Sequence, residues 1–136
     1  MILSHNIKKR ENGQAMVEFA IVVPVLLMLV LGIIQFGILF NHYLTVTDAV
    51  RAGARQAAVS RTLADPAGSA EARVRSAASG SLSDAGDPAA LVVTVMSTFA
   101  QGSDVTVKAT YPYSINLLGV VVKSGRLTSE TTERVE

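Results

Sequence analysis

An uncharged, apolar stretch near the start of the chain constrains its fold more than any other feature. No Asp, Glu, Lys or Arg occurs between Glu18 and Asp48. The most apolar part, residues 19–40, would measure about 33 Å as an α-helix. Because that length crosses the hydrocarbon core of a bilayer, the sequence predicts a single transmembrane helix with a carboxylate at its entrance.

A secretory signal peptide also joins basic residues to an apolar core, but that core spans only about 7–15 residues and ends at a small-residue cleavage site. Here the apolar stretch is longer and runs into TVTDAVRAGARQAAVSR, which is typical of further helix. We therefore predict a retained membrane span. Lys8, Lys9 and Arg10 precede it, so the positive-inside rule places the N-terminus in the cytoplasm and the rest of the chain outside.

The composition argues against several classes of function. The net charge of +1 is too small to predict a nucleic-acid partner, and the absence of Cys excludes disulfides and thiolate metal sites. No glycine-rich phosphate loop and no close pair of carboxylates in an apolar setting is visible. Asp84 and Asp87 flank Gly86, a pattern that favours a solvated turn over calcium binding. We therefore predict no enzyme, no cofactor, no metal site and no small-molecule substrate.

Beyond the membrane the first helix is expected to continue to about Arg61, since no Pro interrupts it. Asp48 and Arg51 are spaced to form an ion pair along it. Small residues recur at every fourth position, which places them on one helix face where another backbone can approach closely: Thr45, Ala49, Gly53 and Ala57. Two interpretations of this face stay open, because it could seat the chain's own C-terminal domain or pack against helices of other subunits.

A second helix is expected after the first. Asp65, Pro66 and Gly68 end the first helix, and Pro66 suits the first turn of a helix over about 67–79. The Ser-, Gly- and Asp-rich residues 80–88 then form a loop.

The remaining sequence is typical of strands. Residues 91–99 and 104–113 are rich in β-branched side chains and are joined by a turn at 101–103. Pro112 should end the second strand or place it on an edge. A short strand or packing segment is expected at 117–122, and a last strand at 127–135 after Gly125.

These patterns together predict an α+β fold. A long N-terminal transmembrane helix continues into a small head with a second helix and an antiparallel sheet of three or four strands. The head, residues 62–136, is small enough that its core should use the helix face as one wall.

The N-terminal part resembles a known family. A basic leader ending in Gly13, then Gln14, then Glu18 and Phe19 at the start of a membrane helix, is similar to the pattern read by type IV prepilin peptidases. More closely, VEFAIVVPVLLMLVLGIIQFG followed by AVRAGARQAAVSR resembles the TadE-like, pilin-like proteins of tight-adherence (Flp) pilus systems.

The resemblance implies a pilin-like fold and a processed precursor. Residues 1–13 would be a leader that a prepilin peptidase removes between Gly13 and Gln14, and residues 14–61 the long N-terminal helix of the mature chain. The implied partners are this peptidase, other pilin-like subunits, the pilus assembly machinery and the membrane. The implied location is the bacterial inner membrane, and the extracellular pilus after assembly.

Each residue of this motif also has a physical interpretation. Gly13 lets the scissile bond lie open to a protease and should end the leader without continuing the helix, or it is an ordinary flexible joint. Glu18 would lie near the positive end of the mature helix's dipole. It could pair with the new α-amino group at Gln14 of its own chain or of a neighbour, or simply face headgroup water. Phe19 is interpreted as a membrane contact.

Four other residues of the span carry expectations. Pro24 should kink or loosen the helix. Gln35 should hydrogen-bond to another helix or to a backbone carbonyl. His42 and Tyr43 lie at the outer end of the span and are interpreted as anchors in the membrane interface.

Three functional hypotheses follow. The first is a non-catalytic pilin-like (pseudopilin) protein that is processed and takes part in tight-adherence pilus assembly. The second is an unprocessed bitopic membrane protein whose exported head is an interaction module. The third, an exported enzyme or sensor on a membrane stalk, is disfavoured because no catalytic site is visible.

Overall fold

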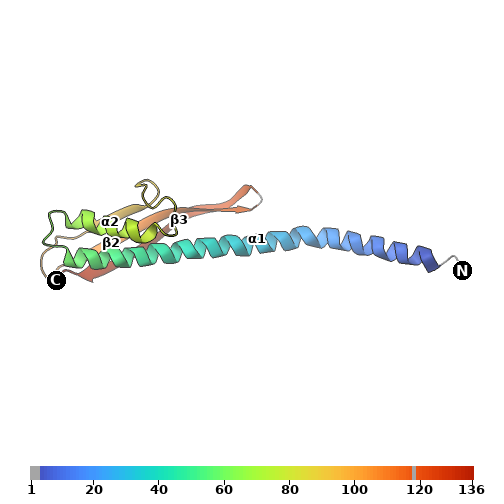
Figure 1. Cartoon of the computed structure of the whole chain (residues 1–136), viewed down its shortest axis with the longest axis horizontal. Coiled ribbons are helices and arrows are strands. Elements are labelled where there is room, and N and C mark those ends of the chain that lie inside the picture. The colour runs from blue at the N-terminus through green and yellow to red at the C-terminus, as the bar shows by residue number, and fades with distance from the viewer. Residues whose placement is uncertain (1–3, 118) are drawn as a thin grey trace.

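The computed structural model describes residues 4–117 and 119–136, with side chains from Gly13 onward. In chain order the elements are two helices and three strands: α1 (Ser4–Val59), α2 (Pro66–Ala78), β1 (Val92–Met96), β2 (Asp104–Leu117) and β3 (Val120–Arg134). Figure 1 shows the N-terminal half of α1 projecting away from a head that packs along its C-terminal half. The predicted α+β class, with a long first helix, a second helix and an antiparallel sheet, is confirmed.

Helix α1 is one continuous element from Ser4 to Val59. It continues through Pro24, and Figure 1 shows a gentle curve of the ribbon in place of a sharp kink. It ends two residues before the predicted Arg61. The C-terminal segment of the chain stabilises this end, because the Glu136 N–H donates to the Ala58 carbonyl. The Ser60 hydroxyl donates to the Ala57 carbonyl in the same way, which satisfies a second free acceptor.

The core lies between the C-terminal half of α1, helix α2 and one face of the sheet. Its buried members are mostly alanine and valine, with two leucines and one tyrosine: Val46, Ala49, Val50, Ala54, Ala57, Ala58, Ala70, Val74, Ala78, Leu82, Ala85, Leu91, Val105, Val107, Ala109, Tyr111 and Val135. Because α1 supplies so many of them, the head has no complete core without this helix. The expectation that the helix forms one wall of the head is confirmed.

The sheet has the order β1-β2-β3, with both neighbouring pairs antiparallel. Alternate residues of β2 face the core, from Val105 to Tyr111. The opposite face is polar. Thr106 and Thr132 share a hydrogen bond of 2.8 Å across it, and Lys108 approaches Glu130 to 3.7 Å. One apolar and one polar face are typical of an antiparallel sheet that is covered on one side only.

Strands β2 and β3 are longer than predicted and form an extended hairpin. β2 continues past Pro112 to Leu117, and β3 begins at Val120 in place of the expected start at residue 127. The predicted segment 117–122 is therefore not a separate strand but the end of this hairpin, with residue 118 outside the described residues. β1 is also shorter than the predicted 91–99.

Two residues that were interpreted as strand ends are accommodated inside the hairpin. At Pro112, β2 pairs with β3 alone, because its pairing with β1 ends at Thr110. A residue without an N–H is tolerated on such a locally free edge. Gly125 pairs with Tyr113, whose ring lies over it so closely that a Cβ there would be 2.9 Å from the ring. The aromatic ring therefore replaces the missing side chain of the glycine.

Helix α2 starts as predicted, with Pro66 in its first turn. The Asp65 side chain accepts a hydrogen bond of 2.8 Å from the Gly68 N–H and caps the helix. Arg75 links α2 to the following loop, because its guanidinium donates to the Glu71 carboxylate and to the Ala85 carbonyl. The predicted loop 80–88 is thus ordered against the helix.

Replacing Asp65 with alanine should lower the stability of the head by about 1 kcal/mol, because the Gly68 N–H loses its acceptor. Pulse proteolysis in urea with the detergent-solubilised chain would measure this loss. Asp48→Ala is the matched control, since the exposed Asp48–Arg51 pair, at 3.4 Å, should contribute less than about 0.5 kcal/mol. Equal midpoints for Asp65→Ala and the parent chain would contradict the capping role.

Candidate functional site

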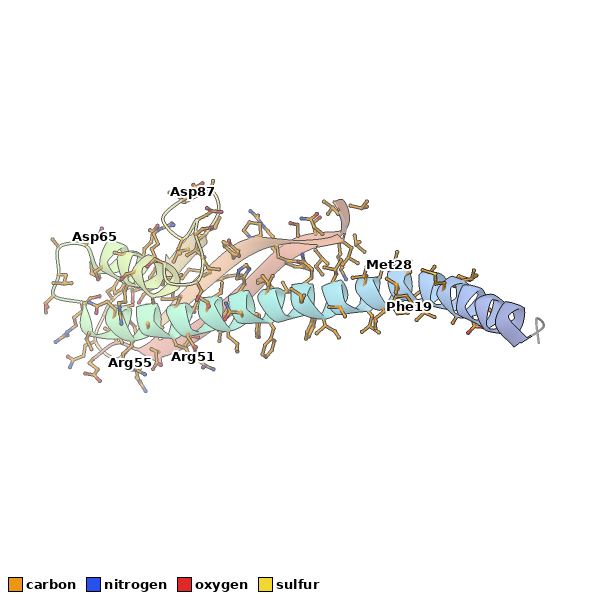
Figure 2. All side chains as sticks on the ribbon, turned by 45° about the vertical axis from the view of Figure 1, so that its right-hand side comes forward. Phe19, Met28, Arg51, Arg55, Asp65 and Asp87 are labelled. Atoms are coloured by element: carbon orange, nitrogen blue, oxygen red, sulfur yellow. The ribbon has the colours of Figure 1, made fainter. Side chains whose placement is uncertain are left out.

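The N-terminal half of α1 is the candidate functional site, because the head leaves it uncovered. From Gly13 onward the described helix is long and apolar enough to cross a membrane, and none of its most apolar window is buried inside the molecule. Large apolar side chains project from all sides of it, as Figure 2 shows around Phe19 and Met28. This contiguous apolar surface is far larger than the apolar patches that soluble monomeric proteins expose to water. It therefore requires a lipid or protein environment.

Glu18 is the only carboxylate on this uncovered surface between Gly13 and Asp48. Its Oε1 accepts a hydrogen bond of 3.1 Å from the Gln14 side chain, one helical turn earlier. Both side chains are exposed, so Glu18 can still reach a partner outside its own chain. The structure thus brings together two of the predicted motif residues, Gln14 and Glu18. Phe19 is exposed beside them and available for contact with lipid or with another helix.

The backbone at the predicted cleavage position differs from expectation. α1 passes through Gly13 as regular helix, whereas the sequence predicted an extended segment there. The i→i−4 hydrogen bonds of the surrounding residues continue through a single glycine, at a cost of only about 1 kcal/mol relative to alanine. A Cβ at Gly13 would meet nothing within 4 Å, so no packing requires glycine at this position. The side chains of the leader residues Lys8, Lys9 and Arg10 lie outside the described residues.

The predicted small-residue face lies at the other end of α1 and packs within the molecule. Ala49, Gly53 and Ala57 are buried and Thr45 is half-buried. A Cβ at Gly53 would collide with the Val74 side chain and lie 3.2 Å from the Ala70 carbonyl oxygen. In the structure this face therefore seats α2, which is the first of the two interpretations left open by the sequence.

Arg51 and Arg55 project from α1 into solvent, as Figure 2 shows. The predicted ion pair between Asp48 and Arg51 is present, at 3.4 Å. Arg55 lines a shallow exposed depression with Arg73 of α2. Arg55 and Arg73 are therefore two exposed cations that border the same depression.

His42 and Gln35 face the β2–β3 hairpin. The His42 ring packs edge-on against Tyr111, with ring centroids 5.7 Å apart. The long β2–β3 hairpin covers this side of the helix, and the role of His42 as an anchor in the membrane interface stays a prediction. Tyr43 is exposed, as an interface anchor requires. Gln35 lines a cleft of about 170 Å³ between α1 and residues 111–114 of β2.

Burial raises the pKa of the Tyr111 hydroxyl above its ordinary value, and the nearby Asp84 carboxylate raises it further. The phenol therefore stays neutral beside His42 at physiological pH. No group of three or more metal-ligating side chains occurs in the described part of the chain. The sequence did not indicate the His42–Tyr111 contact, since a single His and a strand Tyr carry no pairing signal.

Comparison with known proteins adds one finding. The family model described as TadE-like protein matches residues 13–55. No significant match is found among curated proteins or among solved structures. The matched segment contains the uncovered part of α1, the motif around Glu18 and most of the small-residue face. The resemblance predicted from the residues is therefore confirmed for this segment, and the first helix of the chain is similar to that of TadE-like proteins.

Proposed function

We propose that this chain is a non-catalytic, pilin-like membrane protein that takes part in the assembly of a tight-adherence pilus. The observation that carries the proposal is an uncovered apolar helix with one carboxylate near its start, within a segment similar to TadE-like proteins. Such a helix can leave lipid only for another apolar environment, which the core of a helical filament provides. The small head then stays outside this core.

In this proposal a prepilin peptidase removes residues 1–13 at the cytoplasmic face of the inner membrane. The head lies on the opposite side of the membrane. The new α-amino group at Gln14 and the Glu18 carboxylate are one helical turn apart. The α-amino group of one subunit can therefore pair with the Glu18 carboxylate of an adjacent subunit. Because α1 is helical at Gly13, the peptidase has to unwind the helix locally. Glycine makes that unwinding easier than any residue with a side chain except proline.

The intact mass of the protein isolated from membranes tests the processing step. We expect a chain that starts at Gln14. Gly13→Val should retain residues 1–13, because a bulky β-branched side chain beside the scissile carbonyl obstructs access of the peptidase. Ala15→Val, on the other side of the bond, is the control and should still be cleaved. A parent chain that keeps Met1 to Gly13 would rule out processing.

The alternative is an unprocessed bitopic protein whose head binds a partner. The exposed depression lined by the two cations Arg55 and Arg73 is the surface that favours it. This alternative predicts a retained leader together with normal membrane insertion, so the same mass measurement separates the two proposals.

A further inference from the structure

The β2–β3 hairpin reaches back along α1 toward the membrane span. Tyr111 packs on His42, two residues beyond the predicted end of the span at Phe40. From Tyr111 the hairpin continues to Leu117, which is about 20 Å of strand. Figure 1 shows it running beside α1 in the direction of the N-terminus. Its end must therefore lie level with residues inside the predicted span.

The burial of α1 follows the same path. Leu31, Gln35, Leu39 and His42 recur along one helix face, and all are half-buried although most of the surrounding helix is exposed. On the hairpin, Tyr113, Ile115 and Leu117 continue the face of Tyr111 and are also half-buried. The hairpin and the apolar helix thus approach each other over several helical turns.

The hairpin tip, defined here as Leu117 and Val120–Val122, is apolar, and its three valines are exposed. Val120, Val121 and Val122 expose 66%, 58% and 61% of their surface. Val120 and Val121 are neighbours on the strand and point to opposite faces, so both faces of the tip are apolar, and Val122 is the extra residue of a β-bulge opposite Ile115 and Asn116. The chain turns here through Gly119, whose φ of +87° suits glycine. The tip is therefore an ordered apolar projection rather than part of the core.

Two cations follow the tip along β3, and the second of them lies near the predicted outer end of the span. Lys123 comes directly after Val122, and Arg126 pairs with Pro112, next to the Tyr111–His42 contact. Both side chains are exposed. Long cationic side chains next to an apolar segment are typical of structures that insert into lipid, since they can reach toward the headgroups while their stems cover apolar surface.

We propose that the hairpin tip inserts into the membrane leaflet on the side of the head. The apolar surface of the tip continues that of the transmembrane helix, so the bilayer that surrounds α1 also meets the tip. The free outer edges of the two strands limit the depth, because backbone groups without partners are costly in hydrocarbon. Insertion fixes the head close to the bilayer and sets its rotation about α1. The inference requires α1 to span a membrane but is independent of leader removal.

Depth-dependent quenching of tryptophan fluorescence tests this placement. The chain contains no Trp, so one introduced Trp reports its own surroundings. The full-length variant Val122→Trp would be placed in nanodiscs made with lipids brominated on their acyl chains. We expect it to lose most of its emission relative to nanodiscs of unbrominated lipid. Val122 is exposed, so the substitution leaves the core intact.

Two matched variants make the result interpretable. Thr128→Trp lies on the same strand, six residues or up to about 20 Å further from the tip than Val122, and should keep its emission. Leu29→Trp, in the uncovered part of α1, should be quenched by the lipid. Quenching of Leu29→Trp without quenching of Val122→Trp would overturn the inference and leave the span intact. Protection of Val122→Trp from both brominated lipid and a water-soluble quencher would also overturn it, because a protein partner would then cover the tip.

Discussion

Glu18→Val is expected to abolish pilus formation while membrane insertion and removal of residues 1–13 continue. The variant makes the helix entrance more apolar, so insertion is not impaired. It removes the only carboxylate that can meet the α-amino group of Gln14 from an adjacent subunit. An unpaired charge in an apolar filament core is much less favourable than a paired one. Electron microscopy of surface pili, together with the intact mass of the membrane form, would measure the two effects separately.

Two further variants test whether the position of the carboxylate matters. Glu18→Val combined with Val22→Glu restores the charge on about the same helix face, one turn further along, and should not restore pili. Gln14→Ala removes the 3.1 Å hydrogen bond to Glu18 within the chain and should leave pili in place if the chain is still cleaved. Normal pili from cleaved Glu18→Val protein would refute the role proposed for this residue.

Gly53→Leu is expected to destabilise the head by about 3 kcal/mol, at the upper end of the usual cost of overpacking. A side chain at Gly53 collides with Val74, and behind it lies the Ala70 carbonyl, which is backbone and cannot rotate away. Helices α1 and α2 would have to separate, which opens the core that they share. The urea midpoint in pulse proteolysis of the detergent-solubilised chain would report this loss.

Gly37→Leu is the matched control on the same helix. A Cβ at Gly37 meets nothing within 4 Å, so the same substitution should leave the head unchanged. The pair also separates the two interpretations of the small-residue face. If this face served mainly to pack against other subunits, Gly53→Leu would keep a stable head and lose assembly. A head as stable as that of Gly37→Leu would therefore contradict the packing seen here.

Local patterns in the sequence predicted the individual elements well. The apolar stretch gave the first helix, and the Asp65-Pro66 pair gave the start of α2, because capping depends only on neighbouring residues. β-Branched alternation located β1 and the first part of β2. The motif residues Gln14 and Glu18 could also be chosen from the sequence, since their spacing places them one helical turn apart.

The long hairpin was missed because two local signals were misleading. Pro112 and Gly125 are typical strand ends, and here both lie within strands. Pro112 is tolerated because β1 ends before it, and Gly125 because the Tyr113 ring covers it. Both reasons depend on a neighbouring strand. A residue-by-residue pattern contains no information about that neighbour.

The sequence alone determined that a helix long enough to cross a bilayer begins beside a single carboxylate, because hydropathy and helical spacing are local properties. It also determined which faces of the later elements are apolar or small. Only the tertiary structure decided what covers those faces: α2 lies on Gly53, and Tyr111 lies on His42. The physical reason is that close packing depends on the shapes of two surfaces, whereas periodicity describes one. For the same reason the reach of the hairpin along α1 emerged only from the fold.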